Sequence, residues 1–301
     1  MDPQSRTEGD PVTKTLRTAW ILAPAALLAV AFLLFVAFPG AAAPLVAPKT
    51  LELGKGPTIV FIHGLGENRM VWMPTARKLV SKHHVVLVDL PGHGESPLPD
   101  PFTLEAAAEE LDLVLAKQNP DSTVIVGQGE GGMLALLDLK AHPGRVRGIA
   151  AIGTELKSPL KVDDQEIKYF LDKLDANYDQ MLKRMATASG RDSTEGLAIH
   201  AMAIQTPRPT MRSYIEALLT ADATTALKSF QSPFLFIAPD HIFKGGKTTG
   251  TMLREYGYPD TASVAVRRIA NAGTLVMQGQ PDTLAAVIAE FTVRTLAAKK
   301  K

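Results

Sequence analysis

The chain has 301 residues, of which 46% are hydrophobic and 21% are charged, a composition that suits one large or two small globular domains. Its formal net charge of +1 excludes the strongly basic surface expected of a nucleic-acid-binding protein. It contains no cysteine, which excludes disulfides, zinc sites with thiolate ligands and a cysteine nucleophile.

The N-terminal region contains one long apolar segment. Residues 19–38 carry no charged side chain, and a helix of about 20 residues is long enough to cross the roughly 30 Å hydrocarbon core of a bilayer. Lys14 and Arg17 precede the segment, and Lys49 is the first positive charge after it. The positive-inside rule therefore predicts a single-pass protein of the cell membrane, with residues 1–18 cytoplasmic and the remaining chain extracytoplasmic.

A cleaved signal peptide is the alternative reading of this segment. Ala41, Ala42 and Ala43 provide an Ala-x-Ala cleavage site, and cleavage there would give a secreted protein. The apolar stretch exceeds the roughly 7 to 15 residues of a usual signal peptide, so a retained anchor is favoured. Residues 39–50 are rich in Ala and Pro and are predicted to form a linker.

Short apolar runs, each followed by a loop rich in Gly, Pro or Asp, alternate with helical patterns after residue 50. The predicted strands are 58–62, 85–88, 123–126, 149–152 and 234–237, and the predicted helices between them include 73–82, 104–118 and 133–141. This alternation indicates a mostly parallel sheet covered by helices on both faces. Ligands of such sheets bind at the carboxyl ends of the strands.

One insertion interrupts the alternation. Residues 157–225 contain helical patterns at 163–186, 194–204 and 209–219. We therefore predict an α/β core formed by residues 51–156 and 226–298, with residues 157–225 forming a helical cap over the sheet edge.

Three glycine-containing motifs follow successive predicted strands. They are His63-Gly64-Leu65-Gly66, then Asp89-Leu90-Pro91-Gly92-His93-Gly94-Glu95-Ser96, then Gly127-Gln128-Gly129-Glu130-Gly131-Gly132. In this order they resemble the α/β-hydrolase fold, particularly its lid-bearing esterase and C–C hydrolase branches. Residues 271–277 and Gln280-Pro281 are similar to the family's last loop and final helix start, so the resemblance spans almost the whole chain after residue 50.

The resemblance implies a nucleophile elbow, in which a strand turns sharply into a helix at Gly-x-Ser-x-Gly. Here the flanking residues Gly127 and Gly131 are kept, but Gly129 stands at the serine position. Glycine has no side chain that can attack a substrate. The resemblance also assigns the two oxyanion-hole donors to the backbone N–H groups of Leu65 and Glu130.

The other two members of the family's catalytic triad also differ. Thr274 stands at the position of the general base, and the last histidine of the chain is His241. An ungapped match puts Ile242 at the position of the acid, whereas Asp240 lies two residues earlier. Because triad members act as a unit, the positions Gly129, Asp240 and Thr274 together predict loss of the covalent mechanism.

The same strand ends carry other candidate groups for catalysis or metal binding. His63 and His93 belong to motifs that shape loops, and with Gly64 and His241 they are candidate pocket residues. His241 and Asp240 form a candidate water-activating pair, although neighbouring side chains on an extended loop tend to point apart. The spacing of His63, His93, His241 and Asp89 indicates no particular metal, so no metal site is predicted.

A nucleotide cofactor is not predicted either. Gly127-x-Gly129-x-x-Gly132 matches a dinucleotide fingerprint, but Glu155 lies too far along the chain to be its acidic partner. The sequence Lys244-Gly245-Gly246-Lys247-Thr248 has part of a phosphate-binding loop, with His241 where the first glycine belongs.

Two hypotheses on function follow. The favoured one is a membrane-anchored, non-catalytic relative of the hydrolases that binds a small molecule or serves as an accessory subunit of a membrane complex. Its basis is the absence of the serine and the histidine at Gly129 and Thr274. The alternative is an active hydrolase of ester-like or C–C bonds that uses other groups near the same pocket, such as His241 and Asp240.

Overall fold

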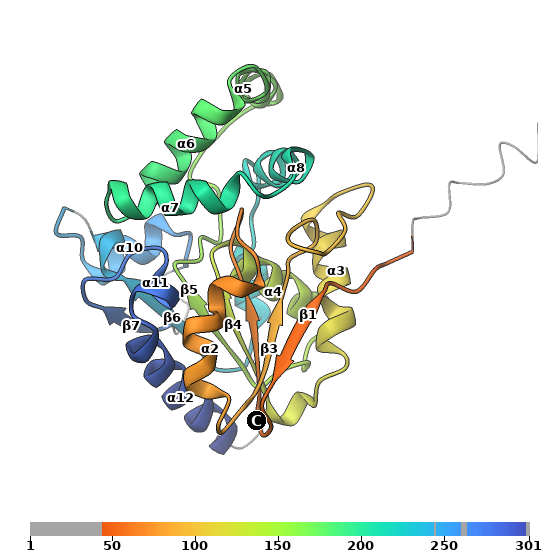
Figure 1. The fold of residues 1–301 in the computed structure, drawn as a ribbon, viewed down its shortest axis with the longest axis vertical. Helices are drawn as coiled ribbons and strands as arrows, with labels where there is room; N and C mark the ends of the chain where they lie inside the picture. Colours follow the sequence, from red (N-terminus) through yellow and green to blue (C-terminus); the bar gives the residue numbers. More distant parts are fainter. Residues whose placement is uncertain (1–43, 244, 260–263, 299–301) are drawn as a thin grey trace, which may run out of the picture. The chain divides into compact units, whose positions relative to one another are not determined.

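The computed structural model describes residues 44–243, 245–259 and 264–298. Residues 45–301 form one compact unit, built on a seven-stranded sheet (Figure 1). The strands are β1 (Thr50–Leu53), β2 (Thr58–Ile62), β3 (His84–Val88), β4 (Thr123–Gln128), β5 (Gly148–Ile152), β6 (Phe234–Pro239) and β7 (Ala265–Ile269). Their order across the sheet is β1-β3-β2-β4-β5-β6-β7. Only β1 runs antiparallel to its neighbour, so the predicted mostly parallel sheet is confirmed.

The predicted membrane segment at residues 19–38 and the predicted cytoplasmic segment at 1–18 lie outside the described residues. Within the part of the chain that is described, no helix combines the length and the apolar character needed to cross a bilayer. The prediction of a single-pass membrane protein rested on sequence hydropathy alone, and the described residues give it no support.

The two edge strands were not predicted. In β7 most side chains are exposed, and the strand reads Ala-Val-Arg-Arg-Ile; β1 has no fully buried residue. By contrast, every residue of β2, β4 and β5 is buried, because helices cover both faces of the central strands. An apolar run therefore identifies a central strand and misses a half-exposed one at the edge.

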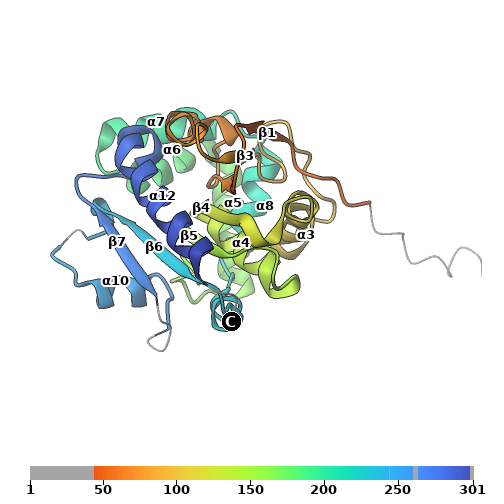
Figure 2. The ribbon, with the colours of Figure 1, turned by 90° about the horizontal axis from the view of Figure 1, so that it is seen from below.

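Helices cover the two faces of the sheet (Figure 2). One face is covered by α2 (Met73–Leu79), α11 (Val276–Gly279) and α12 (Pro281–Ala297), and the other by α3 (Leu104–Leu115), α4 (Glu130–Ala141), α9 (Thr224–Ser229) and α10 (Thr249–Glu255). Short 3₁₀ helices lie at η1 (Arg69–Trp72), η2 (Pro120–Ser122) and η3 (Asp240–Phe243). The predicted flanking of the sheet by helices is therefore confirmed.

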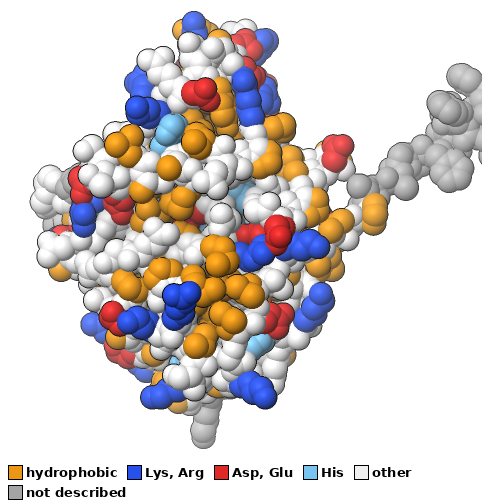
Figure 3. Space-filling view, in the orientation of Figure 1, with side chains coloured by type: hydrophobic (Ala, Val, Ile, Leu, Met, Phe, Trp, Pro, Cys, Tyr) orange, Lys and Arg blue, Asp and Glu red, His pale blue; other side chains and the backbone are white. Residues whose placement is uncertain are grey.

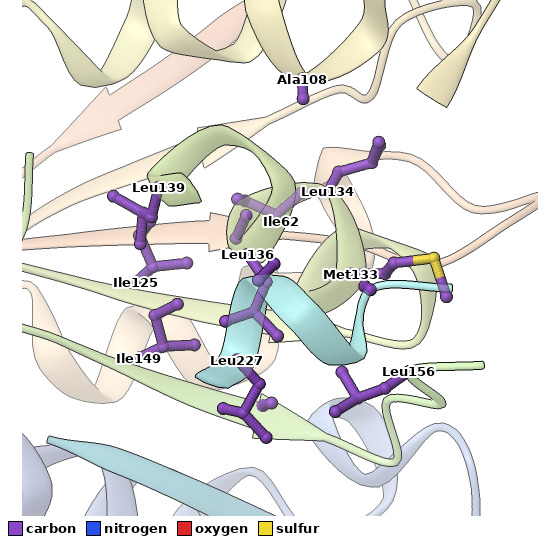
Figure 4. Close-up of a cluster of buried hydrophobic side chains, with 14 of the residues drawn as sticks. Ile62, Ala108, Ile125, Met133, Leu134, Leu136, Leu139, Ile149, Leu156 and Leu227 are labelled. Atoms are coloured by element: carbon purple, nitrogen blue, oxygen red, sulfur yellow. The ribbon is translucent and has the colours of Figure 1, made fainter. Parts of the chain in front are cut away.

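Helix α4 is held against the sheet by apolar side chains (Figure 4). Leu136 and Leu139 of α4 lie with Ile125 of β4 and Ile149 of β5 in one buried cluster, which Leu227 of α9 also joins. Burying a side chain of this size contributes about 1.5 to 3 kcal/mol. Because α4 starts directly after Gly129, this packing fixes the position of the turn at the helix start.

Four further helices lie over the carboxyl ends of the strands (Figure 1). They are α5 (Asp164–Ala176), α6 (Tyr178–Ser189), α7 (Ser193–Ala203) and α8 (Arg208–Leu218), and we call them the cap. The sequence pattern predicted a single helix over 163–186, whereas the structure ends α5 at Ala176 and starts α6 at Tyr178, with Asn177 between them at φ −133°.

On the face shown in Figure 3, Lys and Arg side chains are interspersed with Asp and Glu side chains. No large area of this face carries a single charge, which agrees with the formal net charge of +1.

Candidate functional site

The register of the sheet brings the strand ends together. Ile62 of β2 pairs with Val88 of β3 on one side and with Gly127 of β4 on the other, and Ile152 of β5 pairs with Gln128. The loops that follow these strands therefore meet at one edge, beneath the cap. A cavity of about 930 Å³ lies there. The core contributes Gly129, Glu130, Glu155, His241 and Thr274 to its lining, and the cap contributes mostly apolar side chains, among them Phe170, Leu182, Ile199, Met211 and Ile215.

Gly129 forms the turn between β4 and α4, at φ +52° and ψ −122°. A Cβ atom added at Gly129 would have only one neighbour within 4 Å, the Cα atom of Gly64 at 3.8 Å. A Cβ at Gly127 would lie 2.5 Å from the Cα atom of Gly132. The turn is therefore as tight as a nucleophile elbow requires, while the space above Gly129 is open.

Gly131→Ala should disrupt this turn. Its Cβ atom would lie 2.4 Å from the backbone oxygen of His63 and 2.7 Å from that of Ile62, and neither strand end can move away cheaply. We expect the free energy of unfolding to fall by more than about 3 kcal/mol, measured by urea denaturation. Gly279→Ala is the control because nothing lies within 4 Å of its added Cβ; equal losses for both variants would contradict the expectation.

The backbone N–H of Leu65, which the family resemblance assigns as an oxyanion-hole donor, already binds a side chain of the protein itself. The backbone N–H of Leu65 donates to Oε2 of Glu130 over 2.8 Å. For Glu130, the family resemblance predicted a role for the backbone N–H alone. The position of its carboxylate beside Leu65 was not predicted. A substrate oxygen that uses the Leu65 N–H must therefore displace the Glu130 carboxylate.

His63 and His93 shape the loops around the site. Nε2 of His63 accepts from the backbone N–H of Leu90 over 3.0 Å, and Nε2 of His93 accepts from that of Gly66 over 3.2 Å. Burial lowers the pKa of His63 to about 4 and that of His93 to about 3. Both rings are fully buried and neither lines the cavity, nor does Gly64. They hold the loops as neutral side chains.

His241 and Thr274 meet at the cavity. Nε2 of His241 lies 3.1 Å from Oγ1 of Thr274. The Thr274 hydroxyl donates its single proton to the backbone oxygen of Ser189 in the cap, so Oγ1 accepts from Nε2–H of His241. An imidazole from the loop after β6 therefore reaches the residue that stands at the family's histidine position. Thr274 fixes the ring from one side.

Asp240 is bound by one residue of β7 and by one residue that follows this strand. Its carboxylate binds the guanidinium of Arg268 and accepts from the backbone N–H of Asn271 over 3.2 Å. The hydrogen bond from Arg268 lowers the pKa of Asp240, which therefore stays ionised. The water-activating pair of His241 and Asp240 stays a prediction, and the charge of His241 adds a smaller lowering effect to the pKa of Asp240.

Two glutamates near Gly129 were missed by sequence analysis. Glu67 is buried and accepts from the backbone N–H of Gly64 over 3.3 Å. Burial raises the pKa of Glu67 to about 8, and the Glu130 charge adds to this rise. Glu155 lines the cavity, and its pKa is also raised, first by burial and then by Glu130. The sequence contained one weak indication that Glu67 belongs to the site, because this residue directly follows the first glycine motif.

The raised pKa of Glu67 makes stability depend on pH. In the folded protein this carboxyl keeps its proton up to about pH 8, whereas the unfolded chain releases it near pH 4.5. The contribution of Glu67 to the free energy of unfolding is therefore largest below about pH 4.5 and declines as the pH rises to about 8.

Glu67→Gln removes that decline because its amide is neutral at every pH. We expect the free energy of unfolding of the variant, relative to the unmodified protein, to rise by about 1 to 3 kcal/mol between pH 5 and pH 8. Urea denaturation at both pH values measures this difference. Glu105→Gln, at an exposed position of α3, is the control; a difference for Glu67→Gln that is the same at both pH values would contradict the expectation.

The comparisons with known proteins agree with this geometry. Residues 57–195 match the alpha/beta hydrolase fold family. Over 196 residues the chain is 31% identical to the Pimeloyl-[acyl-carrier protein] methyl ester esterase of Chromobacterium violaceum, a match that covers 60% of this chain and 74% of that protein. The chain belongs to the alpha/beta hydrolase family. The esterase of the same name from Proteus mirabilis is 28% identical over 243 residues, which cover 73% of this chain and 88% of that protein.

Solved structures support the same fold. A hydrolase from Oleispira antarctica superposes with a TM-score of 0.67 at 16% identity, covering 83% of this chain and 96% of that chain. A thermophilic esterase from Thermogutta terrifontis also gives a TM-score of 0.67, at 20% identity, covering 83% and 94% of the two chains.

These relatives correct the predicted function. The favoured hypothesis of a non-catalytic, membrane-anchored accessory protein is wrong, because the sequence relatives are named for ester hydrolysis. The alternative of an active hydrolase is the better supported one. The hypothesis rested on the side chains missing at Gly129 and Thr274, whereas the turn and the cavity do not depend on those side chains.

Proposed function

We propose that the protein hydrolyses carboxylic esters by direct attack of a water molecule held above Gly129. The observation that carries this proposal is the open space at Gly129, in a turn that keeps the elbow conformation and borders the cavity. A water molecule in that space would take the place of the family's serine hydroxyl. The named activity of the relatives, methyl ester hydrolysis, supports an ester as the substrate.

The oxyanion in this reaction would be stabilised by the backbone. The ester carbonyl oxygen takes the Leu65 N–H after displacing the Glu130 carboxylate, and the Glu130 N–H is the second donor. Such donors lower the barrier because they are already oriented toward the charge that develops. The carboxylates of Glu130 and Glu155 make the same region unfavourable for an anionic group, so a neutral ester is favoured there.

His241 is the general base of the proposal. Its ring lines the cavity beside Thr274, and it is the cavity's single histidine within the residues described. The water oxygen attacks the carbonyl carbon, and His241 takes a proton from the water. Collapse of the tetrahedral intermediate breaks the bond to the leaving alkoxide, which receives that proton. The products are a carboxylic acid and an alcohol.

The acyl part of the substrate would lie against the cap. Phe170, Leu182, Met211 and Ile215 give this side of the cavity an apolar lining, which suits an aliphatic acyl chain. Methyl esters of aliphatic acids are therefore the first substrates to assay.

The test uses the purified full-length protein and methyl esters of increasing chain length, with acid release followed by titration at constant pH. We expect turnover above the buffer rate, and labelling by a serine-directed fluorophosphonate should be absent at this site. If no ester is turned over faster than in buffer, or if turnover is unchanged in His241→Ala, the proposal is overturned.

A further inference from the structure

A second cluster of titratable side chains lies between α3 and α4, toward the end of α4 that is remote from Gly129. Asp112 belongs to α3, Asp138 to α4, and His142 directly follows α4. One ligand atom of each residue lies within 4.8 Å of the other two. Nδ1 of His142 is 3.1 Å from Oδ1 of Asp138 and 3.7 Å from Oδ1 of Asp112. This group is separate from the cavity beneath the cap.

Asp138 is the unusual member of the cluster. Its side chain is fully buried, and its Oδ2 atom has no hydrogen-bond partner among the residues that the structure describes. A buried carboxylate oxygen without a partner costs free energy, so native proteins normally satisfy such atoms.

The nearby arginine, Arg145, forms its hydrogen bonds with Asp112. Its guanidinium binds Asp112, with Nε 2.6 Å from Oδ1 and Nη2 2.8 Å from Oδ2. This bidentate pair neutralises Asp112 and fixes the direction of its carboxylate. Asp138 then has His142 as its near hydrogen-bond partner. A cation bound through both carboxylate oxygens of Asp138 would also satisfy Oδ2.

We propose that Asp112, Asp138 and His142 bind one divalent transition-metal ion of the zinc type. In a tetrahedral zinc site the bonds are about 2.0 to 2.2 Å, so neighbouring ligand atoms lie about 3.3 to 3.5 Å apart. The two separations from His142 Nδ1, 3.1 and 3.7 Å, fall on either side of that range. One imidazole with two carboxylates suits zinc better than magnesium or calcium, which prefer oxygen ligands alone.

The surroundings allow the ion to enter. The His142 side chain is 27% exposed, so water can reach its ring and can supply a fourth ligand. The ion would connect α3 to α4 at a position about 13 Å along α4 from Gly129. Its role is therefore to stabilise the packing of these two helices, and it takes no part in ester hydrolysis.

The test measures metal binding by the full-length protein. The protein is treated with a chelator, dialysed, and titrated with zinc chloride and with magnesium chloride in a calorimeter; the melting temperature is recorded with and without zinc. We expect one zinc ion per chain, a higher melting temperature with zinc, and no comparable effect of magnesium. Absence of saturable zinc binding would overturn the proposal.

Variants locate the site. Asp138→Asn keeps the side-chain shape but removes the charge, and His142→Gln changes a side chain that is accessible to solvent. Each should weaken zinc binding by more than about tenfold. His84→Gln is the matched control, because His84 is similarly exposed and pairs with a carboxylate, Glu52, at 3.1 Å. Zinc binding that survives either of the first two variants, or that is lost equally in the control, would overturn the proposal.

A folding defect is separated from loss of the ligand by the metal-free melting temperature. If the metal-free melting temperature of Asp138→Asn is close to that of the unmodified protein and zinc no longer raises it, the variant has lost a metal ligand and not its fold. If Asp138→Asn fails to fold, zinc binding by His142→Gln is the deciding measurement, because the His142 side chain is partly exposed and its replacement should leave the fold intact.

Discussion

Gly129→Ser is expected to give a protein that forms a covalent acyl-enzyme, which the unmodified chain cannot form. The added Cβ atom has no neighbour closer than 3.8 Å, and the turn already has the conformation that the family uses at this position. The new hydroxyl would take the place of the attacking water, with His241 in the same cavity. We expect stoichiometric labelling by a fluorophosphonate, and a burst of alcohol release equal to one molecule per chain.

Gly153→Ser is the matched control for this prediction. Gly153 lines the same cavity at φ +53°, and its added Cβ would meet only Cδ of Pro239, at 4.0 Å. Both variants therefore carry a serine hydroxyl at a left-handed position bordering the cavity, but only Gly129 lies in the elbow. Labelling of both variants, or of neither, would contradict the predicted role of the elbow.

His241→Ala should lower kcat/KM for methyl esters by about 10² to 10⁴-fold, the usual contribution of a general base. The variant lacks the imidazole that the proposal assigns to take the proton of the attacking water. KM should change little, because substrate binding depends mainly on the cap and the backbone donors. Steady-state kinetics at a saturating and at a low ester concentration separate the two constants.

Thr274→Val and His84→Ala complete this experiment. Thr274→Val keeps the side-chain volume but removes the hydroxyl that lies 3.1 Å from His241, so we expect a smaller fall, confined to kcat. His84→Ala changes a histidine on β3 that is paired with Glu52 and does not line the cavity. Unchanged kcat in His241→Ala, or an equal loss in His84→Ala, would exclude His241 as the base.

Sequence patterns predicted the central sheet because its strands are apolar on both faces and end in glycine motifs. They could not predict β7, whose Arg267 and Arg268 are exposed at the sheet edge and bind Glu290 and Asp240. They also predicted one helix in place of α5 and α6, because the helical periodicity of the sequence continues across Asn177 although the backbone is not helical there.

At the site, the motifs predicted the turn at Gly129, which the structure has. The two backbone donors follow from the family's sequence pattern and stay a prediction. The approach of His241 to Thr274 depends on a contact between loops 33 residues apart, which no local pattern records. The contact of the Glu130 carboxylate with Leu65 is also long-range, so the sequence placed Glu130 after Gly129 but could not predict the direction of its carboxylate. Burial and long-range contacts decide these features, and sequence spacing does not report them.

The hydrogen bond from Leu65 to the Glu130 carboxylate has a consequence for turnover. Ester hydrolysis produces a carboxylate, the same chemical group that occupies this donor when the site is empty. Two anions cannot share one N–H without strong repulsion, so the return of Glu130 would drive the acid product from the site. Under the proposed ester hydrolysis, the resting protein would hold its own analogue of the product, which would weaken ester binding and favour release of the acid once it is formed.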